Sequence, residues 1–300
     1  MREPTKTIVY TCPYVPAEWI AAHGLRPRRM VPLPKDGATI IPRVEGLCPY
    51  ARALANDVAA SGEAAGIVVT TVCDQMRRVF DLMVRRIDTP AFLLNVPSTW
   101  QTVAARRLYL DELKRLGRFL VRLGGREPDK NHLAQVMQDY DNAGEHVTGL
   151  LRTDGIPVAV LGGPLMQRDR VLFTIIEQSG GCIVLDATET GQRGRRSAFD
   201  RRALAEGPLM ELARAYFEIP DASRRPNSEL YKWLKRELVQ AGARGIIFHH
   251  YVWCDTWHAE LGRLKEWTDL PVLQLDSDGR GDTSIARSQN RIRAFLEMLQ

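Results

Sequence analysis

Two short apolar runs in this sequence end in the same way, on a cysteine that is followed at once by an aspartate. One run begins at Gly66 and reaches Cys73, and the other begins at Gly245 and leads to Cys254. Short apolar runs of this kind are typical of buried strands. A proline follows each cysteine by seventeen residues and opens another apolar run. The repeat predicts two related halves, each presenting one thiol beyond the carboxyl end of a strand, where open α/β sheets bind their ligands.

Apolar strand candidates alternate with helical segments along the whole chain. This alternation predicts parallel sheets joined by right-handed crossovers, with about four strands in each half. We therefore expect an α/β fold of two flavodoxin-like or Rossmann-like domains whose parallel sheets face a central cleft. The 300 residues are enough for two domains, and the segment 154–157 marks the expected boundary between residues 1–153 and 154–300. The first domain carries Cys12, Cys48 and Cys73, and the second carries Cys254.

Helix-start signals and charge runs give further local expectations. Asp74 and Asp255 are predicted to be the N-caps of the helices that follow the two cysteines, and Ser98 is predicted to cap a long amphipathic helix, because aspartate and serine favour that position. Residues 29–34 are a candidate for a second short strand. Residues 193–202 are expected to form a basic, solvated loop.

The charge and hydropathy of the chain exclude several classes of protein. The net charge of +5 is spread along the chain, so nucleic acid is not an expected partner, although such a surface suits an anionic substrate. No apolar run approaches the roughly 20 residues of a membrane helix, and the N-terminus has no signal-peptide pattern. We therefore expect a cytoplasmic protein without membrane contact. No P-loop and no glycine-rich dinucleotide fingerprint follow the first strand, so neither route to ATP or dinucleotide binding is expected.

The five cysteines indicate core packing, catalysis or metal binding rather than disulfides. Cys182 lies inside an apolar run, so we expect it in the core. Cys48, Cys73 and Cys254 stand where apolar runs or turns give way to helices, and their wide spacing is not that of a zinc ribbon or a ferredoxin. Two interpretations remain open at this stage. Either these are scattered core cysteines, or they are strand-edge thiolates that hold a cubane iron–sulfur cluster with one iron free of protein thiolate.

Several titratable residues are candidates for the chemistry of the cleft. His249 and His250 are neighbours on one strand, so they point to opposite faces and at most one reaches the cleft; both are also explained as structural residues. Glu18 lies near Cys12 in the first turn of a predicted helix, where it is either an acid–base group or a partner of the helix dipole. Three further carboxylates end strands of the second half and could line the cleft: Asp186, Glu189 and Asp276.

A set of motifs distributed over the chain resembles a known family. The motifs are, in order, Tyr10-Thr11-Cys12-Pro13-Tyr14-Val15-Pro16-x-Glu18, Cys48-Pro49-Tyr50-Ala51-Arg52, Cys73-Asp74-x-Met76-Arg77-Arg78, Phe248-His249-His250 and Cys254-Asp255. They are collinear with those of the 2-hydroxyacyl-CoA dehydratase D-component family, which the sequence resembles from about residue 10 to residue 297. That family also contains the subunits of benzoyl-CoA reductase.

The resemblance implies a specific chemistry. Subunits of this family look like two flavodoxin-like domains that bind one [4Fe–4S] cluster through three cysteines, which correspond to Cys48, Cys73 and Cys254. They pair with a second dehydratase subunit or form homodimers, and an ATP-dependent iron–sulfur activator protein injects one electron. The acyl-CoA substrate then becomes a ketyl radical that eliminates water, and Glu18 is implied as the catalytic proton-transfer or thioester contact. The residues that we assign to substrate binding are Cys12, His249 and His250.

The preferred interpretation is therefore an anaerobic, cytoplasmic iron–sulfur subunit of a lyase of the 2-hydroxyacyl-CoA dehydratase type. One alternative is a reductase subunit, similar to benzoyl-CoA reductase or to double-cubane proteins, that moves electrons to a substrate without removing water. The other alternative is a non-catalytic accessory protein for electron transfer or small-molecule binding. Turnover of hydroxyacyl-CoA separates the first two, and the presence of a cluster separates them from a metal-free binder.

Overall fold

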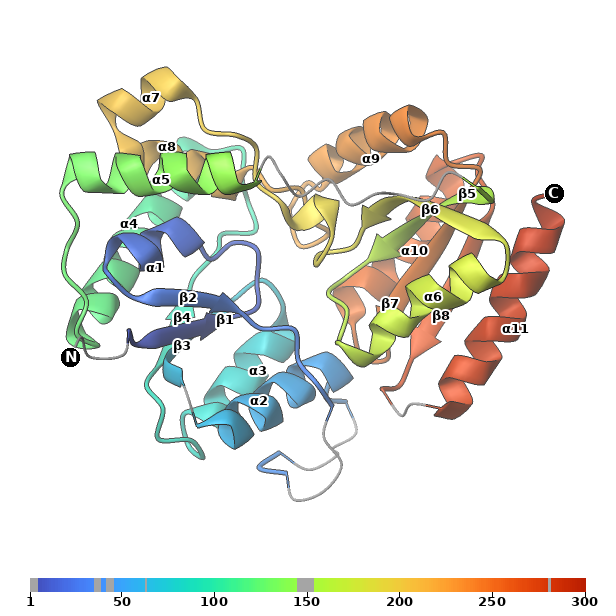
Figure 1. Ribbon diagram of the computed structural model, residues 1–300, viewed down its shortest axis with the longest axis horizontal. Coiled ribbons are helices and arrows are strands. Elements are labelled where there is room, and N and C mark those ends of the chain that lie inside the picture. Colours follow the sequence, from blue (N-terminus) through green and yellow to red (C-terminus); the bar gives the residue numbers. More distant parts are fainter. Residues whose placement is uncertain (1–4, 35–38, 42–45, 63, 145–153, 280–281) are drawn as a thin grey trace.

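The fold is built on two four-stranded parallel sheets. The computed structural model describes residues 5–34, 39–41, 46–62, 64–144, 154–279 and 282–300. The strand order is β2-β1-β3-β4 in the first sheet and β6-β5-β7-β8 in the second. The sheets lie side by side, each with helices on both faces (Figure 1), which confirms the predicted α/β fold. The strands are β1 (Thr7–Tyr10), β2 (Arg26–Arg29), β3 (Ala64–Thr70), β4 (Ala91–Leu94), β5 (Ile156–Gly162), β6 (Gly181–Ala187), β7 (Gly245–Tyr251) and β8 (Val272–Ser277).

The first sheet supports a hydrophobic core on each face, because successive side chains of a strand point to opposite sides. On one face, Ile8 and Val68 pack with α1, α4 and α5. On the other face, Val9 and Ile67 pack with α2 and α3. The helices of this half are α1 (Ala17–Ala22), α2 (Pro49–Ser61), α3 (Asp74–Met83), α4 (Val103–Arg122) and α5 (Lys130–Gly144).

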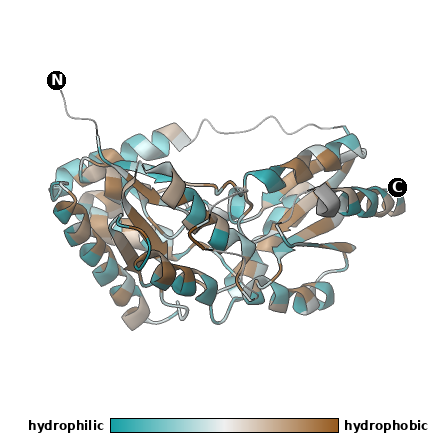
Figure 2. Ribbon diagram, turned by 90° about the horizontal axis from the view of Figure 1, so that it is seen from below, coloured by the Kyte–Doolittle hydropathy of each residue, from teal (hydrophilic) through white to brown (hydrophobic). Residues whose placement is uncertain are grey.

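The second sheet is covered in the same manner. Val158 and Ile247 pack with α6 and α11 on one face, and Ala159 and Ile246 pack with α9 and α10 on the other. Hydrophobic residues accordingly gather on the strands, while the helices alternate between polar and apolar positions (Figure 2). Among the helices of the described ranges, none has the length and apolarity to cross a membrane. The helices that cover this sheet are α6 (Val171–Gln178), α9 (Ser228–Ala241), α10 (Asp255–Trp267) and α11 (Asp282–Met298).

Two helices that follow β6 in the sequence pack on the first half instead. Leu204 of α7 (Arg201–Glu206) and Leu212 of α8 (Pro208–Phe217) belong to the same core as Leu113 of α4. In Figure 1, α7 and α8 lie beside α5, and α8 contacts both α4 and α5. The predicted boundary after residue 153 adjoins residues 145–153, which lie outside the described residues, so it stays a prediction. The hydrophobic core of the first half nevertheless includes residues of α7 and α8, which follow that boundary in the sequence.

Two local expectations are wrong. The second strand is β2 rather than residues 29–34, and the N-cap of α4 is Thr102 rather than Ser98. The Thr102 side chain accepts a hydrogen bond from the Ala105 N–H at 3.1 Å. Ser98 is held outside the helix, because its carbonyl accepts the Arg225 N–H at 2.9 Å and the next residue bridges to the same segment. The long-range contact therefore delays the helix by four residues.

Candidate functional site

A cavity of about 70 Å³, here called the cysteine cavity, lies where the carboxyl edges of the two sheets meet. The strand order reverses between β1 and β3 in the first sheet and between β5 and β7 in the second, and ligands of open α/β sheets bind at such switch points. The walls come from residues just beyond these strands: Cys12 after β1, Cys73 after β3, Pro164 after β5 and Cys254 after β7. The two halves therefore face a central cleft, as predicted.

Three thiols of the cavity stand at helix N-termini. Cys48, Cys73 and Cys254 are the N-cap residues of α2, α3 and α10, and none of them makes a side-chain capping hydrogen bond. The expectation that Asp74 and Asp255 are the N-caps is therefore wrong by one residue, and both aspartates lie in the first turn. The helix dipole and the free N–H groups of a first turn stabilise a thiolate at this position. Three helix ends thus favour negative charge at one place.

Burial acts in the opposite direction on the same thiols. It is the largest cause that raises the pKa of Cys48 to about 11 and the pKa values of Cys73 and Cys254 to about 12. Each thiol also raises the pKa of another, since Cys73 acts on Cys48, Cys254 acts on Cys73, and Cys48 acts on Cys254. The three thiols therefore lie within electrostatic range of one another. A bound cation would hold all three as thiolates, because metal binding displaces the protons of its thiol ligands.

The turn that delivers Cys254 to the cavity is strained. Trp253 has a φ of +65°, in the left-handed region that costs a residue with a Cβ roughly 1–2 kcal/mol. Two backbone hydrogen bonds hold the turn: the Cys254 N–H donates to Tyr251 O at 3.1 Å, and the Val252 N–H donates to Ser277 O at 3.0 Å. Strain of this kind persists where the surrounding structure fixes it and is common at functional sites.

An iron–sulfur cluster is the cofactor expected at these thiols, and it stays a prediction. Among the residues that the structure describes, no three His, Cys, Asp or Glu side chains form a group that could hold one metal ion. A cubane cluster requires a wider set, because each thiolate binds a different iron. The surrounding wall includes the apolar side chains of Val72 and Met76, and restricted solvent access of this kind tunes a cluster. The side chains that could hold such a cluster are Cys48, Cys73 and Cys254.

The remaining two cysteines have different settings. Cys12 lines the cysteine cavity and is buried, and its pKa is raised by burial and by the charge of Glu189, while a hydrogen bond with Thr70 opposes the rise. This position is compatible with the predicted contact to a substrate, which stays a prediction. Cys182 is buried inside β6, as expected from its apolar run, and is not part of the cavity wall.

Glu189 brings a carboxylate to the cavity from the loop after β6. Burial and the nearby Asp221 raise its pKa to about 7, against the opposing charges of Arg193 and Arg29. A carboxyl group with such a pKa exchanges its proton near neutrality. The charge of Glu189 raises the pKa of four other groups of the cavity wall, which are Cys12, Tyr50, Cys73 and Cys254.

A buried ion pair supports the wall next to Glu189. Arg193 has no exposed surface, and its Nη1 lies 2.6 Å from Oδ2 of Asp221, which lines the cavity. The expectation of a solvated loop at residues 193–202 is therefore wrong for Arg193, whose guanidinium also lies 4.7 Å from the ring of Trp257. A charge run in the sequence does not distinguish a buried arginine from exposed ones. The guanidinium donates to three carbonyl oxygens, at 2.9 Å to Gly162 and at 3.0 Å to Ala187 and Pro220.

Two glycines that flank this arginine in the sequence let the loop after β6 pack tightly against Asp186 and Glu189, and they are the available sequence signal for a closely packed loop. A Cβ at Gly194 would lie 1.9 Å from the carbonyl oxygen of Glu189, and one at Gly191 would lie 2.1 Å from the carboxyl carbon of Asp186. Asp186 accepts hydrogen bonds from its own loop, and Asp276 is exposed at the end of β8. Of the three strand-end carboxylates expected at the cleft, Glu189 is the one that lines the cysteine cavity.

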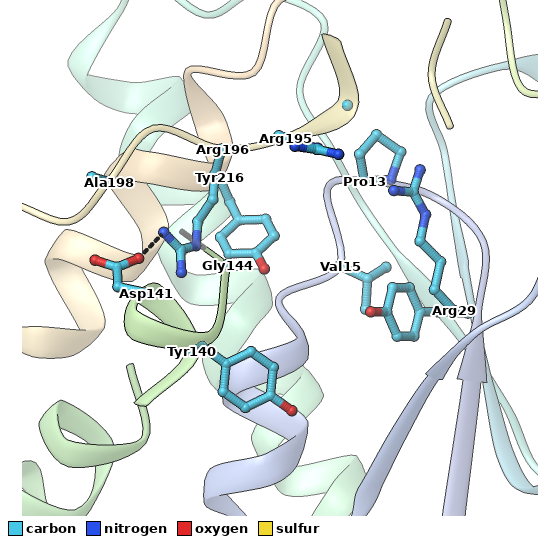
Figure 3. Close-up of a pocket in the computed structure, with 12 residues that line it drawn as sticks. Pro13, Val15, Arg29, Tyr140, Asp141, Gly144, Arg195, Arg196, Ala198 and Tyr216 are labelled. Atoms are coloured by element: carbon cyan, nitrogen blue, oxygen red, sulfur yellow. Dashed lines mark hydrogen bonds and ion pairs between the residues drawn. The ribbon is translucent and has the colours of Figure 1, made fainter. Parts of the chain in front are cut away.

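Glu18 lies at the edge of a second pocket rather than in the wall of the cysteine cavity. Its Oε1 accepts hydrogen bonds from Nε and Nη2 of Arg196 at 2.9 and 2.7 Å, and its Oε2 accepts the Tyr216 hydroxyl at 2.6 Å. Arg196 also pairs with Asp141 at 2.6 Å (Figure 3). Both carboxylate oxygens of the buried Glu18 are thus engaged, and its catalytic role stays a prediction.

This second pocket, here called the arginine pocket, has a volume of about 350 Å³. Figure 3 shows Arg196 and Arg29 on opposite walls. Arg29 Nε donates to Thr11 O and its Nη2 donates to Glu189 O, both at 2.9 Å, and these two acceptor residues line the cysteine cavity. Arg29 therefore connects the two spaces, and guanidinium groups suit carboxylate or phosphate ligands. The charged residues that line the arginine pocket are Arg29, Asp141, Arg195 and Arg196.

His249 and His250 lie in β7, and neither is part of the cysteine cavity wall. The ring of His249 packs edge-on against Tyr251 at 5.1 Å, and that of His250 packs against His258 at 5.4 Å. Burial lowers the pKa of His249 to about 4 and also lowers that of His250. The Nε2 of His250 lies 3.0 Å from Nε2 of Gln274. These are the surroundings of neutral, buried histidines, and their role in substrate binding stays a prediction.

Comparison with known proteins supports one family. A family model described as "2-hydroxyglutaryl-CoA dehydratase, D-component" matches the chain twice, over residues 12–154 and 149–299. No curated protein matches the chain. Among solved structures, the chain is similar to the SBP FpvC of P. aeruginosa, in complex with Ni2+, with 11% identity over 99% of this chain and 97% of that chain and a TM-score of 0.28. It is also similar to a mutant of the laminin-binding adhesin Lmb of Streptococcus agalactiae. The identity is 12% over 99% of this chain and 100% of that chain, and the TM-score is 0.24. At these scores neither structure bears on the function.

Proposed function

Because the chain belongs to the 2-hydroxyglutaryl-CoA dehydratase D-component family, and is thus a dehydratase-type subunit, we propose that it is the iron–sulfur subunit of an enzyme that removes water from a hydroxyacyl-CoA. The observation that carries the proposal is the meeting of three N-cap thiols, from both halves, at one cavity. Nothing in the local sequence requires these thiols to meet. A cofactor that binds three thiolates explains why the three thiols lie together.

In this proposal Cys48, Cys73 and Cys254 hold a [4Fe–4S] cluster. When bound, the cluster supplies one-electron transfer and one iron that lacks a protein thiolate and acts as a Lewis acid. The three helix N-termini offset part of the negative charge of the thiolates. The wall of this cavity of about 70 Å³ buries Cys48 and leaves Cys73 and Cys254 half-buried.

The arginine pocket is the proposed binding site for the anionic part of the CoA ester. Arg195 lines this pocket and is exposed, and Arg29 and Arg196 lie on its opposite walls. Arg29 also donates hydrogen bonds to Thr11 O and Glu189 O, two residues of the cysteine cavity wall, and this supports the proposal that the acyl end of such a ligand lies beside that cavity. Arginine side chains bind phosphates and carboxylates through paired, charge-assisted hydrogen bonds.

The proposal includes two protein partners. Members of this family are components of multi-subunit dehydratase systems, so a partner subunit is expected. We further propose an ATP-dependent iron–sulfur activator protein as the source of the electron. A CoA ester is therefore expected to turn over when the subunit, its partner and the activator are combined, and to stay unchanged when the activator is left out.

Iron and sulfide analysis tests the cofactor. We expect protein purified without oxygen to contain about four irons per chain, and to lose them in Cys48→Ala, Cys73→Ala and Cys254→Ala. The matched control is Cys182→Ala, which removes a buried thiol outside the cavity and should keep the iron. Protein that stays iron-free after anaerobic reconstitution, or cavity variants that keep their iron, would contradict the cluster assignment.

Product analysis tests the reaction. The iron-loaded subunit with its partner and activator should convert a 2-hydroxyacyl-CoA to the enoyl-CoA and water. Reduction of an aromatic CoA ester without loss of water would assign the chain to the reductases instead. An iron-loaded protein that passes electrons but transforms neither ester would be an accessory electron carrier.

A further inference from the structure

Glu189 has the one carboxylate of the cysteine cavity that is held by no hydrogen bond among the described residues. Its pKa is set by burial and by the charges of Asp221, Arg193 and Arg29, without a hydrogen-bond contribution. Asp221, the other carboxylate of the wall, is paired with Arg193 at 2.6 Å and accepts the Ser223 N–H at 2.9 Å. The Glu189 carboxyl group is therefore available to exchange a proton with a ligand.

The backbone of Glu189 is fixed although its carboxyl group is not. Its N–H donates to Gly163 O at 3.2 Å, and its carbonyl oxygen accepts Nη2 of Arg29 at 2.9 Å. Gly194 packs against the same carbonyl, where no Cβ fits. A held peptide limits where the carboxyl group can reach, and a proton donor has to lie within hydrogen-bond distance of its target atom.

Glu18, the carboxylate that the family resemblance implies, has a different setting. Its two oxygens are engaged by Arg196 and by the Tyr216 hydroxyl, and it does not line the cysteine cavity. A proton on Glu18 would break its ion pair with Arg196. The geometry thus favours Glu18 as a residue that holds Arg196 in place beside the arginine pocket.

We propose that Glu189 is the acid–base residue of the cysteine cavity. The inference rests on the proposed dehydration, in which the C–O bond of the substrate hydroxyl breaks and a C–H bond on the adjacent carbon also breaks. The protonated Glu189 carboxyl group gives its proton to the leaving hydroxide, which forms water. The carboxylate then takes the proton released from carbon and is protonated again. The electron supplied by the activator stays with the substrate during both steps and is returned when the enoyl-CoA forms, so no further oxidant or reductant is consumed.

The test compares Glu189→Gln, Glu189→Asp and Glu18→Gln in the iron-loaded complex. Glu189→Gln keeps the size and polarity of the side chain but cannot carry the proton, so kcat should fall by about 100-fold or more, the usual contribution of a general acid–base group. Iron content and KM for the CoA ester should stay within about twofold of the wild type, which separates proton transfer from a structural defect. Glu189→Asp keeps the carboxyl group and should recover part of the lost kcat. The matched control is Asp276→Asn, another strand-end carboxylate of this half, which is exposed outside the cavity and should keep full activity.

Two outcomes overturn the inference while leaving the proposed function intact. One is an active wild type together with Glu189→Gln at near-normal kcat. The other is a loss of kcat in Glu18→Gln with unchanged iron and KM while Glu189→Gln stays active.

A wild type that contains iron and turns over no hydroxyacyl-CoA would refute the proposed function instead. In that case, an infrared difference spectrum between the wild type and Glu189→Gln at neutral pH tests whether the Glu189 carboxyl group holds a proton. A protonated-carboxyl band that is present in the wild type and missing in the variant supports a proton held on Glu189, and its absence overturns the inference.

Discussion

Replacing Arg193 by methionine should be among the most destabilising single changes in this chain. The Arg193 side chain is fully buried and donates to the Asp221 carboxylate and to three carbonyl oxygens, each at 3.0 Å or less. Methionine fills a similar volume and keeps a contact with the ring of Trp257, so the change removes the charge and the hydrogen bonds rather than opening a large cavity.

The expected magnitude follows from what the change leaves behind. Removing one partner of a buried ion pair costs about 3–5 kcal/mol, because the other charge stays buried without compensation. Asp221 keeps the hydrogen bond from the Ser223 N–H and lines a cavity that admits water, so we expect the lower end of that range. A loss of about 3 kcal/mol leaves a domain of ordinary stability folded, since native proteins are stable by about 5–15 kcal/mol.

Urea unfolding at pH 7 measures this loss, and a double-mutant cycle isolates its cause. Arg193→Met and Asp221→Leu should each be costly, and the double variant should cost clearly less than the two together, because it leaves no unpaired charge. The matched control is Arg202→Met, which breaks the exposed pair with Glu206 and should change the unfolding free energy by no more than the experimental error. A loss below about 1 kcal/mol in Arg193→Met, or additive costs in the cycle, would refute the role assigned to the pair.

Three further predictions concern the site and its scaffold. Because burial raises the pKa of Glu189 from 4.5 to about 7, the folded chain keeps a proton that the unfolded chain loses, so the unfolding free energy falls as pH rises from about 4.5 to about 7. In urea unfolding of the iron-free chain, Glu189→Gln should remove up to about 3 kcal/mol of that fall between pH 5 and pH 8, and an unchanged pH dependence would contradict the assignment. Thr102→Ala should cost about 1 kcal/mol in urea unfolding through the lost cap of α4, whereas Ser98→Ala should cost almost nothing. Gly194→Ala should lower the unfolding midpoint because its Cβ meets the Glu189 carbonyl, while Gly207→Ala, with its nearest neighbour at 3.8 Å, should be tolerated.

The fold class follows from local patterns, which is why the sequence predicts it well. Most of the strands are short apolar runs that begin at or just after a glycine or proline, so most of the alternation of strands and helices is readable without long-range contacts; β2, with the sequence Arg-Pro-Arg-Arg, lacks this signal. Helix boundaries depend on more than local preference. Ser98 is a good N-cap by type, but the hydrogen bond of its carbonyl to the Arg225 N–H holds it outside α4. A contact across more than a hundred residues overrides the local signal there.

The site divides in the same way between local and long-range information. The cysteines at strand ends are visible in the sequence because the step from strand to helix is local. The residues that surround these cysteines cannot be predicted in the same way. Arg29 reaches Glu189 across 160 residues of sequence, and a buried arginine has no composition signal of its own. The carboxylates were expected to matter by their place at strand ends, yet Asp186 turns to its own loop and Asp276 to solvent. Only packing decides which of them faces the cavity.

The one-residue difference between aspartate and cysteine at the helix starts has a physical consequence. An aspartate at the N-cap would accept the free N–H groups of the first turn and leave the preceding thiol outside the helix field. With the cysteine at the N-cap and no capping bond from its side chain, those N–H groups face the sulfur instead. The nearby backbone amides of Met76 and Gln75 lower the pKa of Cys73, and that of Trp257 lowers the pKa of Cys254, against the larger effect of burial. Each half therefore places one or more thiols at helix N-termini, which stabilise their negative charge. A cation bound between these helices would be within reach of all three thiols.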